Sequence, residues 1–429
     1  MRGFQAFRPL LQVSALAVIS GCVAVREEAV VAEAPVAEVA AVFGGDTVAV
    51  DPAFEPQGVA EAPPLGSYAG VARRGVVTAG DIDDRLNLAA FQRYLTGARL
   101  GLPQLGLGTP VTVRLAGPRG KSAPGVRYTL RKPGAAEPFH EGYSGPGGRI
   151  ADFPKLLGGG DLSKVELRVF GEDGQEIRRE VVTVGSTTNI LLTEEGGWQP
   201  GFLDLVLVVD TTGSMGDEIA FLQKELIGAT KAAARQAPGV SIRYGLVAYR
   251  DQGDEYVVRN YGFTGQASEM AGWLRGLSAD GGGDYPEAAA AALRAGVGLD
   301  WRRGKGERLL LHVADAPPHD GQAAEYLRAA KAAAEAGVQI FTLGASGVAE
   351  ESEFLMRQAS VATGGRYLFL TDDSGVGNAH GEPTIACYQV TRLADLLARV
   401  LETELSGVWQ EPGAVIREVG SYQRGVCRG

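Results

Sequence analysis

The feature that most constrains the fold is an alternation of apolar strands and amphipathic helices that begins at residue 203. The first strand, LDLVLVV, is an unbroken apolar run, and a helix is predicted over 217–235. Further strand patterns (SIRYGLVAY, RLLLHVA, VQIFTLG and RYLFL) alternate with helical ones up to VTRLADLLARVLETEL. Such alternation is typical of a mostly parallel sheet covered by helices on both faces. We therefore predict a doubly wound, Rossmann-like α/β domain over 203–406, with ligands beyond the carboxyl ends of its strands.

The regions on either side of this domain differ from it in composition and residue pattern. Short runs rich in Val, Ile, Leu and Thr, punctuated by Gly and Pro, predict a small antiparallel β-sandwich domain over 102–196. Its pattern resembles Ig-like or carboxypeptidase-regulatory-like modules, which implies a spacer. Residues 67–101 predict a short helical segment, with Asp81, Asp83 and Asp84 at the N-terminus of the helix. Residues 407–429 form a C-terminal extension.

The N-terminus, MRGFQAFRPLLQVSALAVISGC, has the pattern of an export signal. Arg2 and Arg8 precede an apolar stretch that is too short to span a bilayer. Ile-Ser-Gly-Cys resembles the lipobox of bacterial lipoproteins, which implies that residues 1–22 are a signal peptide and that Cys22 is acylated. An ordinary signal peptide with a chance cysteine is the alternative. Residues 23–66, rich in Ala, Pro and Glu, predict a disordered tether.

If the lipobox is real, the chain is anchored in the bacterial cell envelope. Val23 follows the cysteine where an inner-membrane lipoprotein typically carries Asp. The resemblance therefore favours an outer-membrane lipoprotein, on its periplasmic or surface face. An extracytoplasmic location is oxidising, so we expect Cys387 and Cys427 to form a disulfide, with two isolated buried thiols as the alternative.

A group of oxygen-bearing side chains follows the first strand of the α/β domain. Asp210, Thr212 and Ser214 are spaced Asp-x-Thr-x-Ser, which places a carboxylate and two hydroxyls on one side of a tight loop. These are hard oxygen donors of the kind that Mg²⁺ prefers. Helix capping would use the same residue types, so the motif by itself leaves both interpretations open.

This motif resembles the Asp-x-Ser-x-Ser that opens the metal-ion-dependent adhesion site (MIDAS) of von Willebrand factor type A (VWA) domains. The family's second loop supplies a threonine, in whose place the resemblance implies Asp284 of DGGGDYPEA. The third loop supplies an aspartate, matched by Asp315 of LLLHVAD. The resemblance implies a divalent metal, Mg²⁺ with Mn²⁺ or Ca²⁺ as alternatives. Its implied ligands are Asp210, Thr212, Ser214, Asp284 and Asp315.

The aspartate in the second loop has an electrostatic consequence. Three carboxylates around one divalent ion leave the cluster near −1 in formal charge, which partly quenches the ability of the metal to bind an acidic group of a partner. We therefore expect the site to bind a metal, whereas the third carboxylate argues against an acidic group of a partner as a further ligand of that metal.

The charge and the motifs of the sequence argue against several classes of function. The formal net charge of −10 argues against nucleic acid as a partner. The glycines around Ser214 have the wrong spacing for a serine hydrolase, and no phosphate-loop lysine is present. We predict a membrane-anchored, non-catalytic protein that binds a partner protein, with adhesion as the implied role. The alternatives are a cell-envelope scaffold with a structural metal and, less favoured, a metal-dependent hydrolase.

Overall fold

The computed structural model describes residues 77–428 except 195–198, 284, 346 and 375–382. The expected signal peptide, Cys22 and the tether over 23–66 lie outside these residues. Within the described part of the chain, no helix has both the length and the apolar character needed to cross a bilayer.

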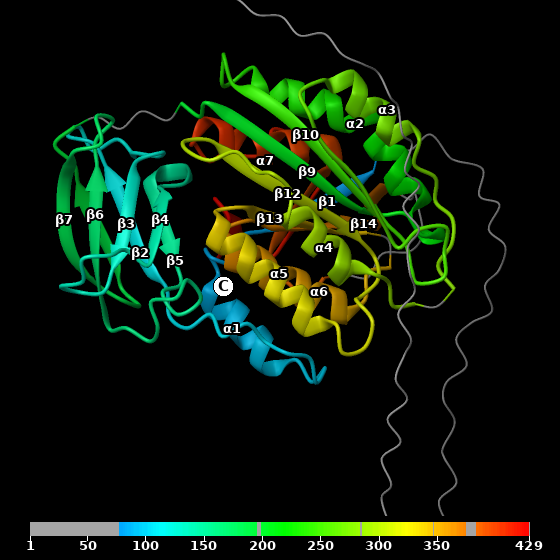
Figure 1. Cartoon of the computed structure of the whole chain (residues 1–429), viewed down its shortest axis with the longest axis horizontal. Coiled ribbons are helices and arrows are strands. Elements are labelled where there is room, and N and C mark those ends of the chain that lie inside the picture. Colours follow the sequence, from blue (N-terminus) through cyan, green and yellow to red (C-terminus); the bar gives the residue numbers. More distant parts are fainter. Residues whose placement is uncertain (1–76, 195–198, 284, 346, 375–382, 429) are drawn as a thin grey trace, which may run out of the picture. The chain divides into compact units, whose positions relative to one another are not determined.

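The largest element is a nine-stranded sheet with the order β11-β10-β9-β12-β13-β14-β1-β15-β16 (Figure 1). Its five central strands run parallel to one another. These are β10 (Ser241–Tyr249), β9 (Phe202–Asp210), β12 (Glu307–Ala314), β13 (Gln339–Gly344) and β14 (Tyr367–Thr371). The outer strands are β11 (Val258–Thr264), β1 (Thr78–Ile82), β15 (Tyr388–Arg392) and β16 (Arg417–Val419). β11 is antiparallel to β10, and β1 is antiparallel to both β14 and β15.

Helices cover both faces of this sheet (Figure 1). One face packs against α2 (Gly216–Ala234), α3 (Ala267–Arg275) and α7 (Leu393–Ser406). The other packs against α1 (Leu88–Gly97), α4 (Ala289–Val297), α5 (Ala323–Ala336) and α6 (Glu350–Thr363). Every residue of β9 is buried, with Val206 and Val208 in one core and Leu205 and Leu207 in the other. Burial on both sides explains why the strand is an unbroken apolar run, and the predicted α/β fold class is confirmed.

The β-rich region lies between α1 and β9 in the chain. Two sheets, ordered β5-β2-β8 and β4-β3-β6-β7, enclose a separate apolar core. Their strands are β2 (Val111–Ala116), β3 (Arg127–Arg131), β4 (His140–Tyr143), β5 (Arg149–Asp152), β6 (Lys164–Phe170), β7 (Glu176–Thr183) and β8 (Thr187–Leu191). The pairs are antiparallel except for β2 with β8. Short elements are the 3₁₀ turns η1 (Pro146–Gly148), η2 (Gly213–Met215) and η3 (Asp372–Ser374), and the β17 (Tyr422–Gln423) and β18 (Val426–Cys427) pair.

The segment expected to be a short helix contains α1 but also β1, which is a strand of the large sheet. The β-rich region is therefore inserted into the α/β domain rather than simply preceding it. The expectation that the aspartates of this segment lie at the start of a helix is wrong, because α1 begins only at Leu88. Asp81 instead lies buried within β1, where Arg399 is 2.6 Å and Arg366 3.4 Å from its carboxylate. Burial and charge pairing with residues far along the chain give no local sequence signal.

Asp84 has a similar role at the end of β1. Its carboxylate is fully buried and accepts two hydrogen bonds of 2.9 Å from the guanidinium of Arg357 on α6. Arg357 also donates to Glu353 at 2.9 Å. The segment that leads into α1 is therefore fastened to α6 by charge-assisted hydrogen bonds, which are shorter and stronger than neutral ones.

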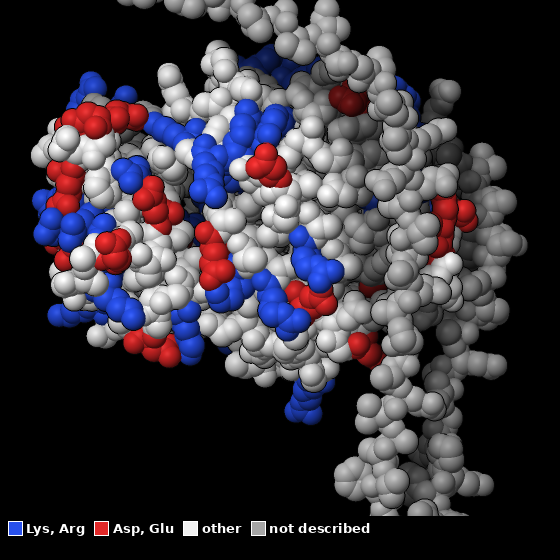
Figure 2. Space-filling view, viewed as in Figure 1, with Lys and Arg blue, Asp and Glu red and all other residues white. Residues whose placement is uncertain are grey.

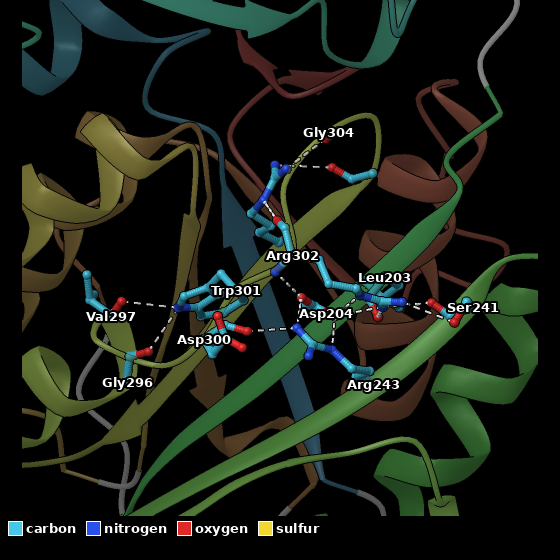
Figure 3. Close-up of polar contacts among 12 residues, drawn as sticks. Leu203, Asp204, Ser241, Arg243, Gly296, Val297, Asp300, Trp301, Arg302 and Gly304 are labelled. Carbon is cyan, nitrogen blue, oxygen red and sulfur yellow. Dashed lines mark hydrogen bonds and ion pairs between the residues drawn. The ribbon is translucent and has the colours of Figure 1, made fainter. Parts of the chain in front are cut away.

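A second buried carboxylate network lies at the amino edge of the parallel strands, where β9 begins (Figure 3). Asp204 has no exposed surface and accepts hydrogen bonds from Arg243 at 2.7 and 3.0 Å. It also accepts from the backbone and side chain of Arg302 at 2.9 and 2.7 Å. Arg302 extends the network to the carbonyl oxygens of Leu203 and Ser241. Burial alone would raise the pKa of Asp204, but the hydrogen bonds from the two arginines lower it. The hydrogen bonds between Asp204 and Arg302 thus hold the loop before β12 against the start of β9.

The C-terminal extension is joined to the fold by strand pairing, a disulfide and hydrogen bonds. β16 pairs with β15 and so forms the edge of the large sheet. Cys387 and Cys427 are joined by a disulfide, with Cα atoms 5.5 Å apart. The side chain of Asn87 accepts a hydrogen bond from the backbone of Cys427 at 2.8 Å and donates to Gly425 at 2.6 Å. The end of the chain is therefore held against the start of α1.

Candidate metal centre

The first loop of the candidate site follows β9. Asp210 is the last residue of that strand, and its side chain is fully buried. Its Oδ1 accepts hydrogen bonds from the backbone N–H of Thr212 at 2.9 Å and from the Thr212 hydroxyl at 2.7 Å. Its Oδ2 has no hydrogen-bond partner among the described residues. Thr212 therefore orients Asp210 and leaves one carboxylate oxygen available.

The third loop follows β12 and brings Asp315 to the first loop. The exposed Ser214, in η2, is hydrogen-bonded to the Asp315 carboxylate, which is itself buried. The Oδ1 atom of Asp315 has no hydrogen-bond partner within the described part of the chain. Asp315 also interacts unfavourably with Asp210. The structure thus brings Asp210, Thr212, Ser214 and Asp315 together.

The second loop contacts the first loop on both sides of Thr212. Asp284, the predicted ligand of this loop, lies outside the described residues. The N–H of Gly213 donates to the carbonyl of Gly281 at 3.1 Å, and the N–H of Asp280 donates to Thr211 at 3.1 Å. At Gly282, φ is +74°, and a Cβ atom would lie 3.1 Å from the Cβ of Thr212. The glycines of this loop therefore permit a close approach to Thr212 that a side chain would obstruct.

Glu287 is a member of the site that the sequence interpretation missed. It is only 4% exposed, and its Oε2 has no hydrogen-bond partner among the described residues. Its other oxygen lies beside Gly282, 2.9 Å from where a Cβ atom would be. The sequence pattern places Glu287 at the start of a helix, as an ordinary first-turn acid. The available signal was its position directly after the glycine-rich loop, on the same short segment as Asp284.

Four carboxylates on three other loops interact unfavourably with Glu287. Burial, followed by repulsion from Asp210, Asp251, Asp315 and Asp254, raises the pKa of Glu287 to about 9. Burial and the neighbouring Asp315 raise the pKa of Asp210 to about 7. Burial also raises the pKa of Asp315, where the hydrogen bond from Ser214 opposes the shift. Without a cation, this site favours protonated carboxyl groups.

The donor set fits a hard divalent cation. Asp210 Oδ2, Asp315 Oδ1 and Glu287 Oε2 are buried oxygens that lack hydrogen-bond partners in the described structure. Carboxylate and hydroxyl oxygens suit Mg²⁺, Mn²⁺ or Ca²⁺. Among the described residues, no three His, Cys, Asp or Glu side chains are arranged to hold a metal ion. A metal here would therefore need hydroxyl groups, water or the side chain at position 284 in addition to Asp210 and Asp315.

Hydrogen bonds from residues that are not candidate ligands hold the first and second loops in place. The buried Arg250 donates to the carbonyl oxygens of Thr211 at 3.2 Å and Ser278 at 3.1 Å, which joins the first loop to the second. Thr211 donates to the carbonyl of Tyr249 at 2.8 Å. These contacts position the loops. The residues that make them are not candidate ligands of the metal.

The histidines near the site are occupied elsewhere. The Nε2 atom of His319, at the rim of the third loop, is hydrogen-bonded to Asp251. His312 is buried between the hydroxyl groups of Tyr249 at 3.2 Å and Tyr326 at 3.0 Å. Burial lowers the pKa of His312 to about 3, so it is a neutral core residue.

Part of the chain matches a known protein family. Residues 204–376 match the family described as von Willebrand factor A domain. The chain is 32% identical over 117 residues to an ariadne-like RING finger protein of Acanthamoeba polyphaga mimivirus, covering 27% of this chain and 11% of that protein. It is 27% identical over 121 residues to the alpha-protein kinase vwkA of Dictyostelium discoideum, covering 27% and 19%. The chain thus spans less than a fifth of the length of either relative.

Two solved structures are similar at low sequence identity. The conserved hypothetical protein BatB of Bacteroides thetaiotaomicron is 16% identical, with a TM-score of 0.32, and the match covers 42% of this chain and 92% of that one. The pilus adhesin SpaC of Lactobacillus rhamnosus GG is 14% identical, with a TM-score of 0.35, and the match covers 56% and 32%.

Proposed function

Residues 204–376 form a von Willebrand factor A domain, and on that premise we propose that the protein binds another protein through a divalent metal ion at the carboxyl edge of its sheet. Domains of this family typically mediate protein–protein interaction and are generally non-catalytic. The observation that carries the proposal is the set of buried oxygens without hydrogen-bond partners on Asp210, Asp315 and Glu287. Leaving such groups unsatisfied is unfavourable unless a ligand completes them.

In this proposal each residue has its own role. Asp210 and Asp315 hold the metal directly or through water, and Ser214 contributes its hydroxyl. Thr212 orients Asp210, and Asp284 is the proposed ligand from the second loop. The metal, Mg²⁺ or alternatively Mn²⁺ or Ca²⁺, supplies positive charge that offsets the buried carboxylates and open positions for an oxygen of the partner.

Binding is proposed over catalysis because domains of this family are generally non-catalytic. His319, whose Nε2 atom contacts Asp251, is the histidine at the rim of the site. A scaffold role, in which the metal only stiffens the loops, is the second candidate. It is favoured by the direct hydrogen bonds between the first and second loops, which need no metal. Retention of a partner after chelation would support the scaffold, whereas its release would support the metal-dependent contact.

Titration of the full chain with Mg²⁺ tests the metal site. We expect Asp210→Ala to abolish Mg²⁺ binding, because the variant loses the buried carboxylate on which the site is built. Asp280→Asn is the matched control, since Asp280 lies on the neighbouring loop but its side chain is 78% exposed. Its affinity should stay within about twofold of the unchanged protein. Isothermal titration calorimetry measures both, and an unchanged affinity in Asp210→Ala would refute the assignment.

We further propose that the chain is an outer-membrane lipoprotein of the bacterial cell envelope, anchored through Cys22. The support is the resemblance of Ile-Ser-Gly-Cys to a lipobox and the following Val23. Several acyl chains on one cysteine would hold the protein firmly, at about 0.8 kcal/mol for each buried methylene. In bacteria fed a labelled fatty acid, the full chain should incorporate label and Cys22→Ala should not. Equal labelling of the two would exclude Cys22 as the attachment site.

A further inference from the structure

The β-rich region contains a pocket of about 380 Å³. Pockets that bind small ligands have volumes of about 300–1,000 Å³, so this one has room for a small molecule. The pocket lies where β3 begins and where β4 and β6 end, and the turn between β6 and β7 borders it. None of its lining residues belongs to the proposed metal site, so the pocket is a separate feature of the chain.

Two aromatic rings line this pocket. Tyr143 is the last residue of β4 and Phe170 is the last residue of β6, and both are partly exposed. β3 lies between these two strands, and its first residue, Arg127, pairs with Tyr143. The guanidinium of Arg127 lies 4.7 Å from the centre of the Phe170 ring. Further apolar surface comes from Val126, Ile177 and Leu192. The lining thus offers apolar surface to the C–H groups of a ligand.

The same lining carries hydrogen-bond donors and acceptors. Arg127 donates to Glu141 from Nε at 2.9 Å and from Nη2 at 3.0 Å, which uses two of its five N–H groups. Lys305 pairs with one carboxylate oxygen of Glu172 at 2.5 Å, and the other oxygen of Glu172 is not part of that pair. A further carboxylate in the lining is that of the exposed Glu194. The pocket therefore presents both N–H donors and carboxylate acceptors.

Glycines in the turn between β6 and β7 keep the pocket open. The N–H of Gly174, which has a φ of +79°, donates to the carbonyl of Gly171 at 3.0 Å. A Cβ atom at Gly171 would lie 3.0 Å from Oε2 of Glu194 and 3.3 Å from Cγ2 of Ile177. A side chain at position 171 would therefore press on two residues of the lining, and glycine avoids this contact.

The formal charges of the lining cancel. Arg127 and Lys305 contribute two positive charges, and Glu172 and Glu194 contribute two negative charges. Figure 2 shows a similar mixture of basic and acidic side chains across the β-rich region. A pocket without an excess of either sign gives no electrostatic preference to a cation or an anion. The hydroxyl groups of a neutral ligand can use both kinds of polar group, because a hydroxyl both donates and accepts.

We propose that this pocket binds a neutral carbohydrate. The C–H face of a sugar ring packs against Tyr143 and Phe170. Its hydroxyl groups accept from Arg127 and donate to the carboxylates of Glu172 and Glu194, and hydrogen bonds to charged groups are stronger than neutral ones. The β-rich region thereby has a binding role of its own, beyond the spacer that its sequence pattern implies and beyond the metal-dependent function proposed above.

Saturation-transfer NMR on the full chain tests the proposal, with maltose, cellobiose or di-N-acetylchitobiose as the added sugar. We expect at least one of these neutral disaccharides to receive saturation from the protein. Titration of that sugar should show an affinity about fivefold weaker or more in Tyr143→Ala, because an aromatic contact is lost. Tyr261→Ala is the matched control, since Tyr261 is also partly exposed but lies on β11 of the large sheet. Its affinity should stay within about twofold of the unchanged protein.

Glu194→Ala provides a second variant, because Glu194 is exposed and is not part of the apolar core of the β-rich region. Loss of its hydrogen bond to the sugar should weaken binding by about tenfold. If Tyr143→Ala fails to fold, Glu194→Ala decides alone.

The outcomes separate this inference from the metal site. Absence of saturation transfer to all three sugars would overturn the proposal, and so would equal affinities in the pocket variants and the control. Sugar binding should persist in a chelator and in Asp210→Ala. Its loss under either condition would place the sugar at the metal site and would overturn the assignment to the pocket, whereas the proposed metal binding is tested by the Mg²⁺ titration alone.

Discussion

Replacing Asp204 with alanine is expected to lower the free energy of unfolding by about 3–5 kcal/mol, because it removes one member of a buried ion network and leaves the others uncompensated. Asp204 has no exposed surface, whereas Arg243 and Arg302 converge on it from β10 and from the loop before β12 (Figure 3). Without the carboxylate, these guanidinium groups lose the hydrogen-bond acceptor and counter-charge that they share. The midpoint of urea denaturation, with its slope, measures the loss.

Glu172→Ala provides the control for this experiment. Glu172 also forms an ion pair, with Lys305 at 2.5 Å, but its side chain is 74% exposed. Exposed pairs contribute about 0–1 kcal/mol, so this variant should remain close to the unchanged protein. Similar stability losses in the two variants would show that burial does not give Asp204 its expected importance.

The second large effect is a fall in the stability of the metal-free protein as the pH rises from about 5 to 9. In the folded protein the pKa of Asp210 is raised to about 7 and that of Glu287 to about 9. In the unfolded chain both groups ionise near pH 4. Between these values the folded state binds more protons than the unfolded state, so stability declines with pH. The slope is about 1.4 kcal/mol per pH unit for each such group.

Denaturation in a chelator at several pH values measures this decline. Groups with a lowered pKa, such as Asp204, lose their contribution only below about pH 4 and do not mask it. Glu287→Gln should make the decline shallower and should be more stable than the unchanged protein at pH 8. Added Mg²⁺ should restore stability at high pH if the carboxylates bind it. Metal-free stability that stays level or increases from pH 5 to 9 would contradict the expected repulsion within the site.

The site could be predicted only in part from sequence. Asp210, Thr212 and Ser214 form a local motif, and Asp315 follows an apolar strand, so their chemistry is visible in the sequence. Glu287 was missed because its importance arises from carboxylates on three other loops. A glutamate before a run of alanines has the pattern of a helix start, and nothing local reports that it is buried.

The fold shows the same division between local and distant information. The apolar runs of β9 and β12 and the amphipathic helices between the strands determine a parallel sheet with two covered faces, because such strands are stable only when buried on both sides. Only the tertiary structure decides that residues 78–82, TAGDI, become a strand inside the large sheet, between β14 and β15. That segment has no apolar run of its own. It is held by hydrogen bonds to β14 and by two arginines, Arg366 and Arg399, that lie 285 and 318 residues away from Asp81 in the sequence.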